Sequence, residues 1–257
     1  MIEIVIDLKK TLEQNAADYF EKGKKAKSKI EGIKKTIALF NDKLTKIEKE
    51  QIKVEEEKAK EKRTPKWYEK FRWFITSEGF LAVGGRDAGS NELVVKKHME
   101  KNDLVFHTEA AGSPFFILKT ESKQATERSI QEVADATYIF SKSFKAGVGG
   151  INSFWVAPDQ VSTTPPTGEY LERGSFIING KKNNVVPRFN LAIGIREDGA
   201  IMCGPTNAVK KNCVKFIELE QSRGEKPSDV AKKIKKKLGG GLDDIIRALP
   251  AGNVDVK

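Results

Sequence analysis

The sequence predicts an α+β fold in which a long coiled-coil helix precedes one compact domain with a mostly antiparallel sheet. Three observations predict this fold. Apolar residues recur three and four positions apart early in the chain, Pro65 ends that pattern, and short apolar runs separated by turn residues follow. The expected organisation is a terminal strand at 1–9, a coiled-coil helix at 10–64, a compact domain at 65–222 and a basic helical tail at 223–257.

The charge balance favours a polyanionic partner. The 257-residue chain has a formal net charge of +10 and a pI of about 9.4, with 39% hydrophobic and 32% charged residues. Basic side chains that neutralise phosphates release condensed counterions, so such a chain is suited to nucleic acid. Solubility alone is the other interpretation of the same balance. The hydrophobic share still allows a packed core.

Cysteine content and hydropathy bear on the compartment. Cys203 and Cys213 are the only cysteines, too few for a disulfide framework or a zinc knuckle, and a reduced pair in the cytosol is expected. The sequence has no secretory signal and no apolar run near the length that spans a membrane. A cytoplasmic protein without a membrane partner is therefore expected.

The first residues alternate apolar and polar side chains from Ile2 to Leu8, which predicts a strand. No nearby segment is available to pair with this strand. It is therefore expected to be the end of something larger.

A heptad pattern predicts the long helix. From Leu12 to Val54, apolar or small residues recur at alternating spacings for about six heptads, and a helix of about fifty residues would reach roughly 75 Å. A reversal at Asn41-Asp42 is the alternative. Pro65 ends the helix because proline disfavours helical geometry in the residue before it. The central seam comprises Ile30, Ile33, Ile37, Phe40, Leu44 and Ile47.

So narrow an apolar stripe needs a partner helix, and none of matching length follows. The partner is expected from another chain or from a segment outside this sequence, so a homodimer through the seam is predicted, with an antiparallel pair favoured. Between Lys22 and Lys35 the lysines are opposed only by Glu31. Both a phosphate-facing rail and a solvated flank fit that charge run.

Alternating apolar runs and two helical spacings predict the compact domain. Helices are expected at Asn91–Met99 and Thr126–Phe144, the second ended by Gly147. Strands are expected at Phe71–Ile75, Phe80–Val83, Leu104–His107, Phe115–Lys119, Ile151–Val156, Ser175–Ile178, Phe189–Ile195, Ala200–Cys203 and Val214–Glu218.

Two less regular segments complete the chain. Thr163–Gly168 predicts a stiff loop because it contains two adjacent prolines. The tail predicts a basic helix at Ser228–Leu238, capped by Ser228 and broken by three glycines, and a short helix at Leu242–Leu249.

The densest polar segment, Gly84–Glu92, leaves a strand and enters a helix. Backbone N–H groups at such a helix start favour an anion, and glycines let a phosphate approach the backbone. Arg86 supplies a fork suited to phosphate, and Lys96 and Lys97 add charge on the following helix. The spacing fits neither a Walker nor a Rossmann loop. An Arg86–Asp87 pair that stiffens the turn is the alternative.

Two further groups of residues could take part in catalysis or in nucleic-acid binding. His107 and Glu109 resemble a general-base pair, but no nucleophile motif or metal-ligand spacing accompanies them. A contact to nucleic acid and a structural histidine are both open for His107. The run Trp67–Phe74 interleaves rings with basic residues, which can stack nucleobases. Phe71 and Trp73 are nevertheless expected in the core.

Several of these segments together resemble the RNA-binding domain of the NFACT proteins. The resemblance covers about residues 4–220, and the tail resembles archaeal members. Asn15-Ala16 with Tyr19 is similar to the start of the family's second coiled-coil helix. The matching residues are Trp67–Leu81, Gly85-Arg86-Asp87, Asn91-Glu92, Val95–Lys97, Asp103–His107, Pro165–Tyr170, Gly174–Phe176 and Gly180-Lys181.

The resemblance implies a factor that binds large ribosomal subunits obstructed by a peptidyl-tRNA, recruits an aminoacyl-tRNA and promotes C-terminal tailing of the stalled peptide. In this family the chemistry belongs to the ribosome, so neither enzyme activity nor a metal or cofactor is expected. The older family label, fibronectin-binding protein, does not fit the basic composition. The expected partners are tRNA and large-subunit rRNA. The predicted RNA-binding residues are Arg86, Asp87, Asn91, Lys96, Lys97, His107, Lys119 and Lys181.

The sequence departs from the family pattern in two respects. Glu109 and Ala111 stand where the family usually has Asp and His. The family's N-terminal domain, helix-hairpin-helix segment and first coiled-coil helix are not in this sequence, which implies a fragment or a naturally split protein. The absent first helix would be the partner that the heptads require. An interaction scaffold, whose coiled coil docks a ribosome-associated partner, is the alternative function.

Overall fold

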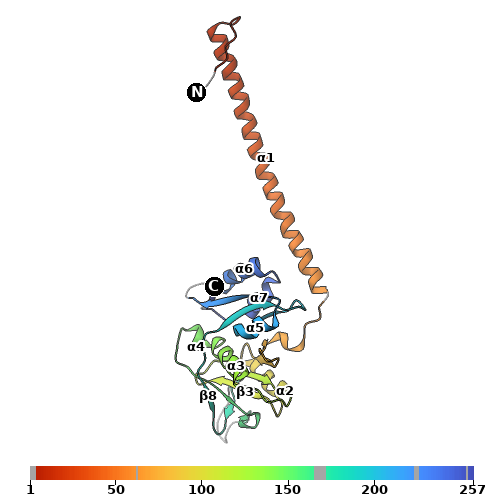
Figure 1. Cartoon of the computed structure of the whole chain (residues 1–257), viewed down its shortest axis with the longest axis vertical. Helices are drawn as coiled ribbons and strands as arrows, with labels where there is room; N and C mark the ends of the chain where they lie inside the picture. The colour runs from red at the N-terminus through yellow and green to blue at the C-terminus, as the bar shows by residue number, and fades with distance from the viewer. Residues whose placement is uncertain (1–3, 62, 165–171, 223–225, 253) are drawn as a thin grey trace. The chain divides into compact units, whose positions relative to one another are not determined.

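The computed structural model describes residues 4–61, 63–164, 172–222, 226–252 and 254–257, and leaves the side chains of residues 46 and 48–61 undescribed. The chain forms two compact units, Met1–Lys60 and Glu61–Lys257. Within the described residues, no helix is both long and apolar enough to span a bilayer. The predicted fold class, a long N-terminal helix followed by a domain with antiparallel sheets, is confirmed (Figure 1).

The first unit is built on α1, Leu12–Glu61, which is 50 residues long. The helix runs through Asn41-Asp42, so the alternative reversal at that place is wrong. The seam residues lie on one helical face because their spacings match the helical period. Within the described part of the unit, every one of them is exposed: Ile30, Ile33, Ile37, Phe40, Leu44 and Ile47.

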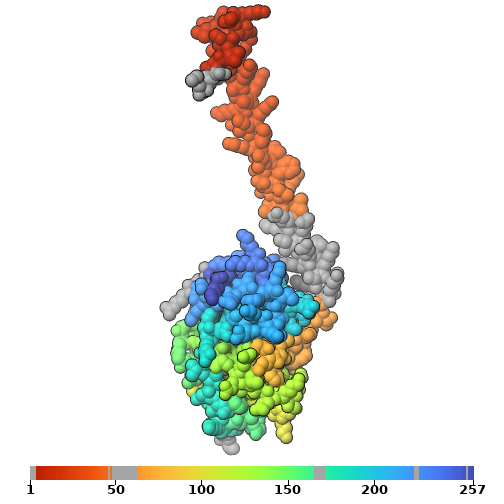
Figure 2. Space-filling model, in the orientation of Figure 1, coloured from red at the N-terminus to blue at the C-terminus, as the bar shows by residue number. Residues whose placement is uncertain are grey.

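The strand expected at 1–9 does not form over residues 4–9, where the chain instead makes a hook against the start of α1. Asn15 is buried and accepts a hydrogen bond from the Asp7 amide at 2.9 Å while donating to the Asp7 carbonyl at 3.0 Å. The Tyr19 hydroxyl bonds both backbone groups of Val5. Side chains of the helix thus make the hydrogen bonds that a neighbouring strand would otherwise make. Figure 2 shows the hook as a thickening of the helix end.

The lysines of the predicted rail do not share one face. At 100° per residue, Lys22 and Lys29 flank one side of the apolar seam and Lys27 and Lys34 flank the other, whereas Lys35 falls on the opposite face of α1. All five are exposed. This spacing therefore does not align the lysines in a single phosphate-facing row along the helix.

The second unit contains a six-stranded antiparallel sheet preceded by a short 3-10 helix, η1, Trp67–Lys70. Helix α3, Glu127–Ile139, packs on this sheet, and α4, Lys142–Lys145, follows it. Helix α2, Ala88–His98, packs beside β2. In spatial order the strands are β1 Arg72–Ile75, β2 Leu81–Gly84, β4 Phe116–Lys119, β3 Leu104–Thr108, β5 Ser153–Val156 and β8 Asn183–Val185.

A second, four-stranded antiparallel sheet carries the C-terminal helices. Its strands, in order, are β10 Ile201–Gly204, β9 Leu191–Ile195, β11 Lys215–Gln221 and β12 Val254–Val256. The accompanying elements are α5 Thr206–Asn212, α6 Pro227–Leu238 and α7 Leu242–Ala248. A small ribbon pairs β6 Val161–Ser162, which follows the 3-10 helix η2 Pro158–Gln160, with β7 Ile177–Ile178.

The segment 223–257 is not a separate tail where the structure describes it. Leu219 pairs with Val256 across β11 and β12, so the end of the chain closes the second sheet. Val230, Ile234 and Ile245 are completely buried in the core beneath that sheet. The expected boundary at 222 missed this packing because β12 is only three residues long. In Figure 2 the blue C-terminal segments lie directly against the light-blue ones.

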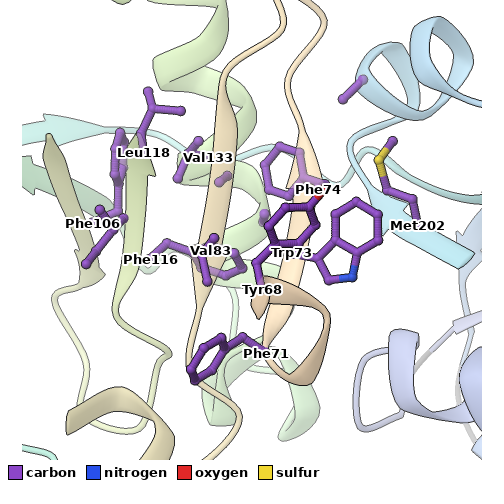
Figure 3. Packing of buried hydrophobic residues seen from close by; sticks show 14 of the residues in the cluster. Tyr68, Phe71, Trp73, Phe74, Val83, Phe106, Phe116, Leu118, Val133 and Met202 are labelled. Carbon is purple, nitrogen blue, oxygen red and sulfur yellow. The ribbon is translucent and has the colours of Figure 1, made fainter. Parts of the chain in front are cut away.

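The main core lies where the two sheets meet (Figure 3). Phe71 and Trp73 are buried there, as predicted. A Cβ at Gly204 would lie 2.9 Å from the Phe74 Cβ, so a glycine lets β10 approach β1 closely. The Ile75 amide also donates to the Met202 sulfur at 3.3 Å. The two sheets therefore belong to one packed body.

Two predicted elements differ in detail. The helix expected at Thr126–Phe144 divides into α3 and α4, because the Ser141 hydroxyl caps the second helix by accepting from the Phe144 amide at 3.1 Å. The strand expected at Ser175–Ile178 is shortened to β7. Positions 165–168 of the predicted stiff loop lie outside the described residues.

Candidate nucleic-acid interface

Arg86 is committed to the protein's own backbone. Its Nε donates to the Lys70 carbonyl at 3.0 Å, one terminal nitrogen donates to the Phe71 carbonyl at 2.8 Å, and the other bonds the Arg247 carbonyl. The planar fork of a guanidinium suits several oxygens at once, which here are carbonyls rather than phosphates. Arg86 therefore ties η1 and α7 to the turn after β2.

The electrostatics agree with a structural role for Arg86. Desolvation, then the nearby charges of Arg72 and Arg247, lower the pKa of Arg86 to about 10, so it remains charged near neutral pH. The prediction that Arg86 contacts phosphate is not supported by this geometry. The alternative Arg86–Asp87 pair is not what stiffens the turn either, because the Arg86 donors point to carbonyls.

The start of α2 is occupied by Asp87. Its carboxylate accepts from the Ser90 amide at 2.8 Å, and the Ser90 hydroxyl accepts from the Asp87 amide at 2.9 Å. The hydrogen bonds that the Asp87 carboxylate accepts from the Ser90 amide and from the Ser90 hydroxyl lower the pKa of Asp87, whose negative charge complements the helix dipole. The predicted phosphate cradle is thus filled by a side chain of the protein itself.

Asn91 explains the glycine beside the turn. Its buried side chain accepts a hydrogen bond from the Phe115 amide at 3.1 Å. A Cβ at Gly85 would overlap the Asn91 side chain. Gly85 therefore admits the asparagine, whose amide oxygen is engaged inside the protein.

Lys119 is also structural. Its ammonium lies 2.7 Å from an Asp103 carboxylate oxygen and donates to the His98 carbonyl at 2.9 Å. The side chains of Lys119 and Asp103 are only 10% and 1% exposed. This buried ion pair fixes the end of α2 to β4, so the ammonium is not free to hold phosphate.

His107 belongs to the aromatic packing under the first sheet. Its ring lies 4.3 Å from that of Phe115, centroid to centroid, and its Nδ1 lies 2.7 Å from the Thr108 carbonyl oxygen. Burial lowers the pKa of His107 to about 4, so the ring is neutral near pH 7. That contact indicates the structural interpretation rather than a base contact.

Three predicted residues remain at the surface. Lys97 and Lys181 are exposed, and no side-chain ion pair is recorded for either within the described residues. Lys96 is exposed but lies 2.6 Å from Glu92, which Arg173 also approaches at 3.3 Å. Such surface pairs contribute little and exchange readily with other partners.

An aromatic pair next to Lys97 was not among the predicted site residues. The Trp67 indole stacks on the His98 imidazole with ring centroids 4.1 Å apart and planes 16° from parallel. Phe71 meets His98 edge-on, at 5.6 Å between ring centroids. Trp67 comes from η1 and His98 from the last turn of α2, so two elements build one stack of rings.

Lysines surround this pair. The Lys70 ammonium lies 5.0 Å from the centroid of the Phe71 ring. Desolvation lowers the pKa of His98, and the positive charges of Lys70, Lys119 and Lys97 lower it further. Lys97 adjoins His98 in the last turn of α2. Because Lys119 is paired with Asp103, Lys70 and Lys97 are the cations open to a ligand.

The sequence held part of the signal for this pair. The alternation of rings and basic residues in Trp67–Phe74 indicated stacking, but it did not separate exposed rings from core rings. His98 gave no signal, because its contact with Trp67 depends on how α2 packs. Among the described residues, no cluster of three or more His, Cys, Asp or Glu is arranged to hold a metal ion.

Comparison with known families places this unit. Residues 70–180 match the family model described as the NFACT protein RNA-binding domain. That match includes the Arg86 turn, α2 and the whole of β3 and β4, and it begins at Lys70, within η1.

Curated relatives agree with that match. The chain is 38% identical over 206 residues to the archaeal Rqc2 homolog aRqcH of Methanocaldococcus jannaschii, covering 77% of this chain and 30% of the relative. It is 43% identical over 130 residues to the ribosome quality control complex subunit NEMF homolog of Drosophila melanogaster, covering 50% of this chain and 13% of the relative. For human NEMF the identity is 39%, with 48% and 11% covered. The chain thus spans less than a third of these relatives, and it belongs to the NFACT family, whose RNA-binding domain it contains.

Proposed function

We propose that this chain binds RNA as part of a ribosome-associated quality-control factor in the cytoplasm. The observation that carries the proposal is the match of residues 70–180 to an RNA-binding domain, in a chain with a net charge of +10. The relatives named as ribosome quality control complex subunits support the cellular context. The proposed ligands are tRNA and the rRNA of an obstructed large subunit.

The proposed role is binding rather than catalysis. His107 packs against Phe115 with its Nδ1 2.7 Å from the Thr108 carbonyl oxygen, and His98 stacks on Trp67, which supports structural or binding roles for both rings. Any C-terminal tailing of a stalled peptide would then use the chemistry of the ribosome. The surface lysines Lys70, Lys97 and Lys181 support contact with an RNA backbone, because their ammonium groups are exposed to solvent, where a phosphate can reach them.

A salt titration of tRNA binding by the whole chain tests this proposal. The logarithm of the association constant is expected to fall linearly with the logarithm of salt concentration, by about 0.7–0.9 for each phosphate contacted. The unrelated polyanion heparin and a neutral protein of similar size serve as controls for charge and for filter retention. Absence of tRNA binding at low salt would refute the proposal.

The exposed seam of α1 supports a second candidate, a coiled-coil interaction scaffold. Ile33, Ile37 and Phe40 are 58%, 54% and 60% exposed, and so much apolar surface is unfavourable in water. We propose a second copy of this helix as the partner, paired antiparallel. Light scattering at micromolar concentration is expected to give the mass of a dimer, and a monomer would contradict the pairing. Partners that survive RNase in a pull-down would favour the scaffold over RNA binding.

A further inference from the structure

The exposure of Trp67 is unusual for its residue type. Trp67 is 43% exposed, whereas Trp73 is 8% exposed and Trp155 is half-buried. A large ring left in water forgoes the stabilisation that burial would give it. His98 stacks on one face of the indole, and the rings of Tyr68 and Phe71 meet it in T-shaped contacts, with centroids 5.6 and 6.3 Å away. The indole nevertheless keeps a large exposed area. A flat apolar surface of this kind accepts another flat ring.

The surrounding structure holds the indole in place. Arg86 fixes the carbonyls of Lys70 and Phe71 at the end of η1. At its start, the Glu69 carboxylate accepts from the Lys66 amide at 2.8 Å and pairs with Arg63. A ring fixed before binding loses little conformational freedom when a ligand stacks on it, so more of the contact energy appears as affinity.

The positive charge around the Trp67–His98 pair favours a ligand that carries phosphate. Lys70 lies over the Phe71 ring at 5.0 Å, Lys97 adjoins His98 in the last turn of α2, and the exposed Lys66 precedes η1. Two carboxylates of these segments have partners elsewhere, since Glu69 is paired with Arg63 and Glu100 lies 3.1 Å from Lys119. An aromatic surface beside exposed ammonium groups matches a nucleobase joined to a charged backbone.

We propose that the Trp67–His98 pair is a stacking platform for an unpaired nucleobase of RNA, with the flanking phosphates at Lys70 and Lys97. The inference rests on the proposed RNA binding and specifies where and how one base is held. The base must be unpaired, because base faces inside a duplex are covered by their neighbours. Stacking is tolerant of sequence, so the platform would hold a single-stranded loop or end without reading its bases.

The test compares single-stranded and duplex RNA of equal length with the whole chain and its variants. Trp67→Ala is expected to weaken single-strand binding about 5- to 150-fold, the range seen when one stacking ring is removed, with the salt slope unchanged. Trp67→Phe keeps a ring and should retain most of the affinity. The double variant Lys70→Ala/Lys97→Ala should lower the salt slope by about 1.4, at about 0.7 per phosphate on single strands.

Tryptophan fluorescence supplies a second readout. Adenine-containing single strands are expected to quench the emission of the wild type and of the matched control Trp155→Phe, but to leave Trp67→Ala unquenched. Circular dichroism on heating checks that each variant is folded. If Trp67→Ala does not fold, the Trp155→Phe protein decides alone, because the buried Trp73 and the surface Trp67 are then its only emitters.

The outcomes separate this inference from the proposed function. The platform is overturned, while RNA binding stands, if Trp67→Ala binds RNA as tightly as the wild type does. The same holds if bound RNA does not quench the tryptophan emission of Trp155→Phe. A wild type that binds no RNA overturns both. Equal affinity for duplex and single strands also overturns the platform. Quenching by an acidic peptide at the same charge, with none by RNA, would reassign the surface to a protein partner.

Discussion

The Gly84–Glu92 turn and the Trp67–His98 pair lie next to each other in the second unit, yet they use their functional groups in opposite ways. In the turn, Arg86 and Asp87 bond to backbone groups of the protein itself. At the pair, Lys97 is exposed and no ion pair is recorded for it within the described residues. The two regions are also joined, because Arg86 holds the carbonyls at the end of η1, the helix that carries Trp67.

The difference teaches that a dense polar motif marks a site only if its groups remain unsatisfied after folding. Buried donors and acceptors nearly always find partners within the protein. Arg86 finds one 161 residues further along, at the Arg247 carbonyl. Residues of the turn should therefore affect stability, and residues of the aromatic pair should affect binding. The predictions that follow probe that division, beginning with the largest effect.

Lys119→Met should have the largest effect on stability. The substitution leaves Asp103 buried without its cation, and breaking a buried pair in this way costs about 3–5 kcal/mol. Chemical denaturation measures the loss. The double variant Lys119→Met/Asp103→Asn should recover part of it. A loss below about 1 kcal/mol would return Lys119 to the list of candidate RNA contacts.

Acid should weaken the fold through His107. Its pKa is about 4 in the fold and about 6.5 in an unfolded chain. The neutral ring therefore contributes stability above pH 6.5, which is lost as pH falls toward 4, at about 1.4 kcal/mol per pKa unit. Asp135, with its pKa raised to about 6 by desolvation, acts in the opposite direction. The difference between the wild type and His107→Phe in pH-dependent denaturation isolates the histidine, and identical pH profiles would contradict its burial as a neutral ring.

Arg86→Ala should destabilise the fold by about 2–3 kcal/mol, because three carbonyls lose their donor. Arg86→Lys keeps the charge but not the planar fork, so its stability should lie between those of Arg86→Ala and the wild type. Denaturant melts measure both variants. If the alanine variant is as stable as the wild type and loses RNA affinity, the turn is a ligand site after all.

Asp87→Ala should cost about 1 kcal/mol through loss of the helix cap. Asp87→Asn keeps an oxygen that can accept from the Ser90 amide and is the matched control. Thermal unfolding provides the comparison. RNA affinity that falls with either variant would argue against a purely structural aspartate.

Lys97→Ala should change stability by less than about 0.5 kcal/mol and lower the salt slope of RNA binding by about 0.7–0.9. Lys142→Ala, on the helix α4 that packs against α3, is the matched exposed control. Filter binding at several salt concentrations separates the two. An equal change in slope for both variants would mean that charge acts without a defined surface.

Local patterns in the sequence predicted the long helix, most strands and the burial of Phe71 and Trp73. These features depend on periodicity and hydrophobicity, which neighbouring residues determine. The hook at residues 4–9 was not predictable in this way, because alternation alone indicates a strand, whereas its hydrogen bonds come from Asn15 and Tyr19. Likewise, β12 was not predictable from its own residues, because its pairing with β11 defines it as a strand.

The candidate site shows the same limit. Lys97 and Lys181 were predicted from charge and are exposed. Arg86 and Lys119 were predicted for the same reason, but Arg247 and Asp103 provide partners that sequence spacing does not reveal. Trp67 depends on His98, which lies 31 positions away and reaches it only after α2 has packed.

Photo-crosslinking of bound single-stranded RNA to the whole chain, followed by peptide mass mapping, tests the central claim most directly. We expect cross-links at residues 66–70 and 96–98, on the two elements that form the aromatic pair, and their loss in Trp67→Ala. Cross-links confined to the turn at 84–92, or spread evenly over the lysines of α1, would contradict the account.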